Sequence, residues 1–163
     1  MDPRIKISEH ISYQESINSI IALQKDIDNT PSDEILEVMI STAEKLFEPL
    51  RNYFNCPIAV TSFFRSLSLN AELVNDPDIL ASKNSQHCKG EAMDINGRIF
   101  GGVSNKQIFL FIRDYLDFDQ LIWELGDDQD PAWVHVSTKY IGENRHQILR
   151  RKIINGVMQY ENL

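Results

Sequence analysis

The sequence contains few of the residues that mark disulfide-rich, collagen-like or low-complexity proteins. It has only two cysteines, Cys56 and Cys88, with seven glycines and six prolines among 163 residues. Two cysteines are too few for a disulfide framework, and they fit a chain that folds in a reducing compartment. The low glycine and proline contents exclude a fibrous or low-complexity chain.

Basic residues and long apolar runs are also scarce. The 16 Lys and Arg residues are outnumbered by 24 Asp and Glu residues, so the formal net charge is −8. Because nucleic-acid binding depends on clustered Lys and Arg, we expect no nucleic-acid partner. A membrane-spanning helix needs about 20 apolar residues in succession. No run approaches this length, so we expect no membrane insertion.

The N-terminal residues lack the basic and then apolar pattern of a secretory signal peptide. We therefore expect synthesis in the cytoplasm without a signal peptide. A substrate outside the cell would then be reached only after release or export. No sequence feature indicates an oligomeric state.

The residues that are present are typical of a globular protein with two strong helices. Hydrophobic residues make up 42% of the chain and charged residues 25%, which suits one domain with a substantial core. Ser32 is a good N-cap, and acidic residues followed by apolar residues at helical spacing predict a helix that runs to about Tyr53. Ser104 caps a second predicted helix that ends near Asp117.

Several short segments predict strands. They cover residues 58–62, which are rich in β-branched residues, and residues 91–95, 120–124 and 133–137. A hairpin over 147–160 turns at Asn155-Gly156. Before them, 9–28 has a short helical stripe, 66–74 predicts a loop or short helix, and 75–78 a polar turn. Together these elements predict a single α+β domain over residues 1–163, with core 28–150 and C-terminal hairpin 147–161. Its small antiparallel sheet would be covered by helices on one side.

A cluster of metal-binding side chains is the most informative feature of the sequence. His87 and Asp94 lie seven residues apart, and His135 follows in the alternating strand Trp133-Val134-His135-Val136. Each residue alone is more often a core histidine or a surface carboxylate than a ligand. Two imidazoles and one carboxylate together suit a zinc ion with one position open for water, which is typical of a hydrolytic site.

These residues resemble the M15 family of zinc peptidases, in particular the D-alanyl-D-alanine carboxypeptidase-like branch found among phage and prophage cell-wall enzymes. The resemblance extends over most of residues 28–150. The motifs that carry it are Ser85-x-His87-x-x-Gly90-x-Ala92-x-Asp94, Trp133-Val134-His135-Val136, Ser62-x-x-Arg65-Ser66 with Asn70, Asn29-Thr30-Pro31-Ser32, and Leu46-Phe47-Glu48-Pro49-Leu50-Arg51.

The resemblance implies an M15/hedgehog-like fold and Zn2+ as cofactor. It implies His87, Asp94 and His135 as zinc ligands, and Arg65 and Ser85 as groups that hold the substrate. The planar fork of Arg65 can bind a carboxylate or stabilise an oxyanion, although the residue can also be an ordinary surface cation. The hydroxyl of Ser85 can hold the substrate, or it can form a hydrogen bond with the local backbone instead.

The general base is the point at which the sequence departs from the family. Many members carry an acid three residues before the last ligand histidine, but this chain has Ala132 there. The candidates are Glu124 and the acids of the turn before Pro131, namely Asp127, Asp128 and Asp130. We favour Glu124, because it ends an apolar strand where burial could raise its pKa to a useful value. Asp130 is the second choice, although Asp before Pro is usually a turn former.

The leading hypothesis is a zinc-dependent peptidase that hydrolyses an amide bond of bacterial peptidoglycan peptide. It would remove a terminal D-Ala or cut an internal bond of the stem or cross-bridge, in the manner of a phage endolysin. Ala132 keeps a second hypothesis open, namely a weak or inactive zinc-containing module that binds the cell wall or serves as a phage structural component. A zinc-free α+β domain is a third.

Overall fold

Six strands form one sheet in the computed structural model, which describes residues 6–76, 79 and 81–163. Residues 1–5, and Pro77 and Asp78 of the predicted polar turn, lie outside the described residues. The strand order is β1-β2-β4-β3-β5-β6. The strands are β1 (Ala59–Ser62), β2 (Ala92–Asn96), β3 (Gln120–Glu124), β4 (Trp133–Ser137), β5 (Gln147–Ile154) and β6 (Val157–Asn162).

The α+β fold is confirmed, but the sheet is mixed rather than antiparallel. All neighbouring strands are antiparallel except β3 and β5, which are parallel. The parallel pair arises because the chain leaves β4 at Ser137, passes the start of β3 and enters β5 at Gln147, which is paired with Gln120. Within the hairpin of β5 and β6, Asn155 and Gly156 both have positive φ, as a type I′ turn requires.

The long predicted helix is confirmed and contains a widened turn. It comprises α3 (Asp33–Thr42), the π-helical segment η1 (Ala43–Phe47) and α4 (Glu48–Phe54). Ser32 caps it by accepting a hydrogen bond from Ile35 N. Pro49 has no N–H to donate and its ring would clash with the carbonyl of Lys45, and the wider turn before it relieves both problems.

The remaining helices begin at serine N-caps. Ser104 and Gln107 form a capping box at the start of α6 (Asn105–Tyr115), which confirms the second predicted helix. Ser66 caps α5 (Leu67–Asn75), so 66–74 forms a helix rather than a loop. The other helical segments are α1 (Tyr13–Ile17), α2 (Ile20–Gln24), and the 3-10 turns η2 (Gln86–Lys89) and η3 (Gly97–Ile99).

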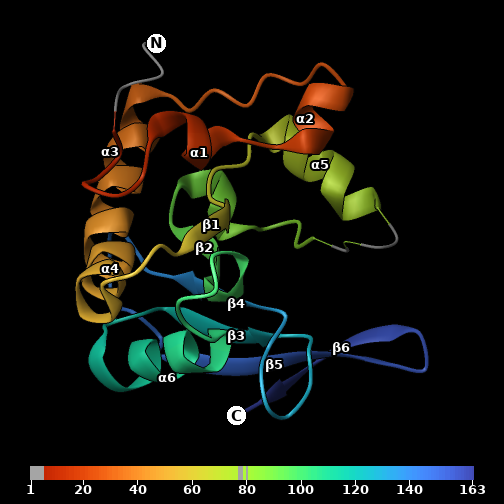
Figure 1. Ribbon diagram of the computed structural model, residues 1–163. Helices are drawn as coiled ribbons and strands as arrows, with labels where there is room; N and C mark the ends of the chain where they lie inside the picture. Colours follow the sequence, from red (N-terminus) through yellow and green to blue (C-terminus); the bar gives the residue numbers. More distant parts are fainter. Residues whose placement is uncertain (1–5, 77–78, 80) are drawn as a thin grey trace.

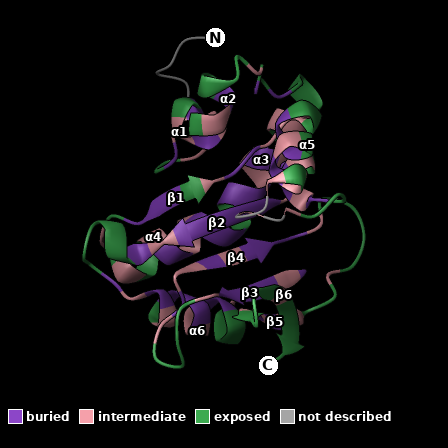
Figure 2. Cartoon of the chain, turned by 90° about the vertical axis from the view of Figure 1, so that its right-hand side faces the viewer, coloured by how far each residue is buried: buried purple, intermediate pink, exposed green. Residues whose placement is uncertain are grey.

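The two faces of the sheet differ in what covers them. One face carries the fully buried side chains of Met93, Ile95, Leu121, Val134 and Val136, which share a hydrophobic cluster with residues of α3, η1, α4 and α6. Figure 1 shows these helices along the sheet, α1, α2 and α5 gathered beyond β1, and the β5–β6 hairpin projecting at the other end. The central strands β2 and β4 are largely buried, whereas β6 is exposed (Figure 2).

Within the described residues, no helix combines the length and apolar character that crossing a membrane requires.

Candidate functional site

The register of the central strands brings two of the predicted ligands together. Asp94 of β2 and His135 of β4 are directly paired, and Oδ1 of Asp94 lies 2.9 Å from Nδ1 of His135. Directly opposed residues project from the same face of a sheet. Both side chains therefore leave the face that the long helix does not cover.

His87 joins this pair from η2, the turn that precedes β2. Its Nδ1 lies 2.7 Å from the carbonyl oxygen of Phe63, and its Nε2 lies 3.5 Å from Oδ1 of Asp94. A carbonyl only accepts hydrogen bonds, so Nδ1 carries the proton and Nε2 presents its lone pair toward Asp94. Burial lowers the pKa of His87 to about 4, and the imidazole is neutral at pH 7.

The glycine of the motif sets the position of His87. Gly90 ends η2 with a φ of +72°, in the left-handed region. A Cβ at this position would lie 2.7 Å from Cγ of Met39 and 3.1 Å from the carbonyl oxygen of Ile35. Only glycine lets the chain turn this close to α3 and lead from His87 into β2.

The three side chains fit a zinc ion. His87, Asp94 and His135 each offer one ligand atom, and these atoms lie within 4.8 Å of one another. Ligands of a tetrahedral zinc, with bonds of about 2.0–2.2 Å, are separated by about 3.3–3.6 Å. The observed separations of 2.9 and 3.5 Å from Oδ1 of Asp94 are close to this range. Burial raises the pKa of Asp94, but both imidazoles outweigh it and hold this pKa well below the usual value, so the carboxylate is charged.

Arg65 lies beside this cluster and contacts the carboxylate of Asp94. Its Nη2 donates to Oδ2 of Asp94 at 2.9 Å, and its Nε donates to Oγ of Ser62 at 3.1 Å. A guanidinium has five N–H donors, so these two bonds leave others for a substrate. Arg65 therefore orients the carboxylate and faces the cleft at the same time.

Asn29 anchors the loop that carries Arg65. Its side-chain amide donates to the carbonyl oxygens of Ile17 and Phe64 at 2.8 and 3.2 Å, and its Oδ1 accepts from Ser66 N at 2.7 Å. Sequence reasoning noted this residue only as part of a motif. The structure gives it the physical role of holding the segment after β1 in place.

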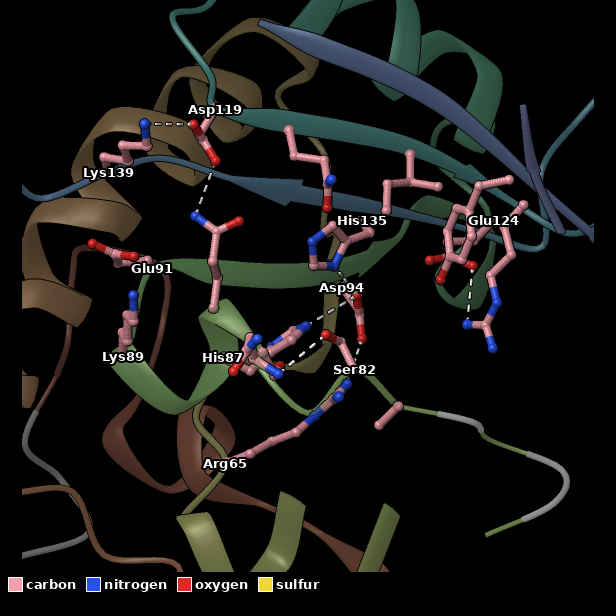
Figure 3. Close-up of a pocket in the computed structure, with 18 of the residues that line it drawn as sticks. Arg65, Ser82, His87, Lys89, Glu91, Asp94, Asp119, Glu124, His135 and Lys139 are labelled. Atoms are coloured by element: carbon pink, nitrogen blue, oxygen red, sulfur yellow. Dashed lines mark hydrogen bonds and ion pairs between the residues drawn. The ribbon is translucent and has the colours of Figure 1, made fainter. Parts of the chain in front are cut away.

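A cleft of about 820 Å³ contains the three predicted ligands together with Arg65 and Ser85. Figure 3 shows His87, Asp94 and His135 between Asp119 on one side and Glu124 on the other. The two sides differ in composition. Gln86, Lys139 and Arg145 contact Asp119 on its side of the cleft. On the other side, Trp133 and Arg151 are paired with Glu124, and Tyr160 is paired with Arg151.

Ser85 lies immediately before η2 and is buried in the wall of the cleft. Its carbonyl oxygen accepts a hydrogen bond from Cys88 N at 3.1 Å.

Burial raises the pKa of the Cys88 thiol, which disfavours the thiolate that a cysteine nucleophile needs. Cys88 is therefore poorly suited to act as a nucleophile in this cleft.

Glu124 reaches the cleft and is nearly fully buried, with 4% of its surface exposed. Ile122 is paired with His135 and Glu124 with Trp133, so Glu124 lies diagonally across from His135 on the same face. Diagonal neighbours are about 7–8 Å apart between backbones, within reach of a long side chain. Burial raises the pKa of Glu124 to about 7, even though His135 and Arg151 oppose the shift.

The other candidate acids do not line the cleft. Oδ1 of Asp130 accepts a hydrogen bond of 2.6 Å from the backbone N of Lys106, at the start of α6. Oδ2 of Asp130 lies 3.5 Å from Nε of Arg98. Asp127 caps the turn that contains Asp130, and Asp128 is paired with Arg150. Of the four acids weighed from the sequence, the structure brings Glu124 to the predicted ligands and leaves Asp127, Asp128 and Asp130 outside.

Sequence reasoning missed two buried charged residues of the cleft, Asp119 and Arg151. Asp119 is completely buried, and it accepts hydrogen bonds from the backbone and guanidinium of Arg145 and from Gln86. Arg151 lies in β5 and forms an ion pair with Glu124 at 3.3 Å. A charged residue inside an otherwise apolar strand was the available signal for Arg151, and an acid directly before a buried strand was the signal for Asp119.

Comparison with known families gives one match that covers most of the chain. The family model described as Peptidase M15 matches residues 9–137, a segment that includes the three predicted ligands, Arg65, Ser85 and Glu124. No curated protein matches the sequence.

Proposed function

The chain belongs to the peptidase M15 family, and from this premise we propose that it is a zinc-dependent peptidase that hydrolyses an amide bond of bacterial peptidoglycan peptide. The observation that carries the proposal is the convergence of His87, Asp94 and His135 in one cleft with a buried acid, Glu124. Residues 1–163 are taken as a single M15-like peptidase domain.

The donor set, which consists of His87, Asp94 and His135, suits a catalytic zinc. Two imidazoles and a carboxylate leave one coordination position free, as catalytic zinc sites do. Bound there, zinc would polarise the scissile carbonyl and make an attacking water more acidic. His87 would bind through Nε2, because its Nδ1 is engaged by the Phe63 carbonyl, and His135 through Nδ1, which faces Asp94.

The residues around the donor set supply the remaining chemistry. Glu124 takes a proton from the attacking water as the new C–O bond forms. It then gives this proton to the amine nitrogen as the C–N bond breaks. A carboxyl group with a pKa of about 7 suits both transfers near neutral pH. Arg65 holds Asp94 and directs its other donors to the substrate, and Ser85 offers a hydroxyl from the wall of the cleft.

The charges of the cleft support a substrate that contains carboxylates. Five of the chain's 16 basic residues line it, namely Arg65, Lys89, Lys139, Arg145 and Arg151, against the four acids Glu91, Asp94, Asp119 and Glu124, so its formal charge is slightly positive in an acidic chain. An overall charge of −8 therefore does not prevent local attraction of an acidic peptide. Stem peptides of the cell wall are such peptides, and the reaction is either removal of a terminal D-Ala or cleavage of an internal bond. The enzyme would meet the wall after release or export, in the manner of a phage-type endolysin.

The test is hydrolysis by the purified zinc-loaded protein. Peptidoglycan and defined stem peptides are incubated with the protein, and mass spectrometry identifies the bond that is cut. Glu124→Gln should lower kcat by about 10²–10⁴-fold, the usual contribution of general acid–base catalysis. Asp128→Asn is the matched control, because this exposed acid lies outside the cleft and should leave the rate unchanged.

Two results would contradict the proposal. Absence of cleavage by the native protein would leave a zinc-containing module that binds the wall, which a pull-down with purified peptidoglycan would detect. Equal cleavage by His135→Ala would show that hydrolysis does not depend on the donor set.

A further inference from the structure

Arg151 faces Glu124 from the neighbouring strand. The two residues are directly paired in the parallel register of β3 and β5, and Nη1 of Arg151 lies 3.3 Å from Oε2 of Glu124. Arg151 is itself buried, with 9% of its surface exposed. It lies in the C-terminal hairpin, outside residues 9–137 that match the family.

The rest of the hairpin and the loop before η2 hold the guanidinium in this position. Its Nη2 donates to the carbonyl oxygen of Ile79 at 2.6 Å. The ring of Tyr160, which is paired with Arg151 across β5 and β6, lies 6.0 Å from the guanidinium carbon. The backbone carbonyl of Arg151 accepts from Leu125 N, the residue after Glu124. These contacts leave the side chain little freedom.

The hydrogen bonding of Arg151 is incomplete. Its Nε is buried and has no partner among the described residues. A buried donor without a partner destabilises the folded state. What Arg151 provides is a fixed positive charge beside one carboxylate.

Glu124 needs such a charge if it is to act as a base. Four groups interact electrostatically with it. Arg151 on β5 and His135 on β4 lie on the neighbouring strands, and Asp94 on β2 and Tyr160 on β6 lie one strand further away. Asp94 is negative and disfavours a second carboxylate nearby. Burial also favours the neutral acid. Arg151 is the cation in ion-pair contact with Glu124, and it opposes both effects.

We propose that Arg151 is a positioning residue of the peptidase, which keeps the Glu124 carboxylate ionised and directed toward the reacting water. This inference rests on the proposed function. The proton still passes from water to Glu124 and from Glu124 to the leaving amine, and Arg151 gives up no proton. The C-terminal hairpin thus contributes to the catalytic cleft.

The kinetic test compares Arg151→Met and Arg151→Lys with the native protein on a stem peptide that the native protein cleaves. Arg151→Met should lower kcat at pH 7 with little change in KM. The acidic limb of its kcat–pH profile should move up by about 1–3 pH units, the effect of one opposite charge on a carboxyl group. Arg151→Lys should restore part of the loss. Lys152→Met is the control, because Lys152 is the next residue of β5 and pairs with Glu161 instead.

A second measurement is independent of hydrolysis. In metal-free protein with ¹³C-labelled glutamate, the Glu124 carboxyl signal is assigned by its absence in Glu124→Gln and is then titrated. Arg151→Met should raise its pKa by about 1–3 units, whereas Lys152→Met should not change it. If the native protein hydrolyses no stem peptide but Arg151→Met still raises the pKa of Glu124, the proposed function is refuted and the electrostatic pairing of Arg151 with Glu124 is retained.

Other outcomes would overturn the inference itself. A rise in KM with an unchanged kcat–pH profile would assign Arg151 to substrate binding. Loss of thermal stability with an unchanged profile would assign it a structural role. A Glu124→Gln/Arg151→Met double variant that is markedly slower than Glu124→Gln alone would show that Arg151 does not act through Glu124.

Discussion

Arg65 donates a hydrogen bond of 2.9 Å to Oδ2 of Asp94, while Oδ1 of the same carboxylate faces His87 and His135. The two oxygens therefore have different partners, a cation on one side and two imidazoles on the other. An arginine in this position affects the donor set as well as any substrate in the cleft.

Replacing Arg65 should weaken metal binding. Outer partners of metal ligands contribute about 10–100-fold in metal affinity, so we expect Arg65→Met to raise the zinc Kd by this factor. Competition with a chromogenic chelator measures it. Arg98→Met is the control, because Arg98 is an exposed arginine that pairs with Asp130 outside the cleft. An unchanged zinc Kd in Arg65→Met, combined with a higher KM, would assign Arg65 to substrate binding alone.

Removal of metal should lower the stability of the protein. A ligand that binds only the folded state at a free concentration of 100 times its Kd stabilises that state by about 2.7 kcal/mol. We expect zinc to raise the free energy of unfolding of the native protein and to leave Asp94→Asn unaffected. Urea unfolding with and without zinc measures the difference. The exposed acid Asp117 provides the control Asp117→Asn, which should respond to zinc as the native protein does.

The metal-free protein should lose stability as the pH rises through the titration range of Glu124. Burial raises this pKa from 4.5 to about 7, so the folded state binds the proton more tightly than the unfolded state. The contribution is complete below pH 4.5 and is lost as the pH passes about 7, a change of about 3 kcal/mol. Urea unfolding in EDTA at pH 5 and 8 should show this slope, and Glu124→Gln should lack it. The same slope in Glu124→Gln would assign it to another group.

Asp119 should have the opposite effect at acidic pH. Although burial raises its pKa, the hydrogen bonds and charge of Arg145 lower it from 3.8 to about 2. This stabilisation is complete above pH 3.8 and is lost as the pH falls through about 2, a change of about 2 kcal/mol. Acid unfolding of Asp119→Asn should be less steep over this range than that of the native protein. Glu37→Gln, at an exposed acid of α3, serves as the control.

Gly90→Ala should destabilise the protein more than Gly101→Ala does. Both glycines have positive φ, 72° and 77°, so both variants incur backbone strain of about 1–2 kcal/mol. A Cβ at Gly101 meets nothing within 4 Å, whereas a Cβ at Gly90 lies 2.7 Å from Met39 Cγ. This clash should add about 1–3 kcal/mol and lower zinc affinity by displacing His87. Equal destabilisation of the two variants would contradict the packing argument.

Much of the site was predictable because its residues have local sequence signals. The helix after Ser32 and the alternation in 133–137 follow from spacing and capping, and the structure confirms both. The convergence of His87, Asp94 and His135 was expected from their types and order, and the structure brings their ligand atoms within 4.8 Å. Their roles as zinc ligands are still a prediction.

Strand order and register were not predictable in this way. Nothing in the sequence around Gln147 indicates that β5 runs parallel to β3. That pairing brings Arg151 beside Glu124, and the turn before Pro131 directs Asp130 to the start of α6 instead of the cleft. The second oxygen of Asp94 likewise meets Arg65 only after β1 and β2 have paired.

The sequence by itself determined the secondary structure and the kinds of side chain available for chemistry, because helical and strand periods, caps and ligand types are local properties of the chain. Only the tertiary structure decided which acid reaches the donor set and which cation accompanies it. Those contacts join residues that are 27 and 29 positions apart, Glu124 with Arg151 and Arg65 with Asp94. Such separations are bridged by strand pairing and packing, and neither is encoded in the local pattern.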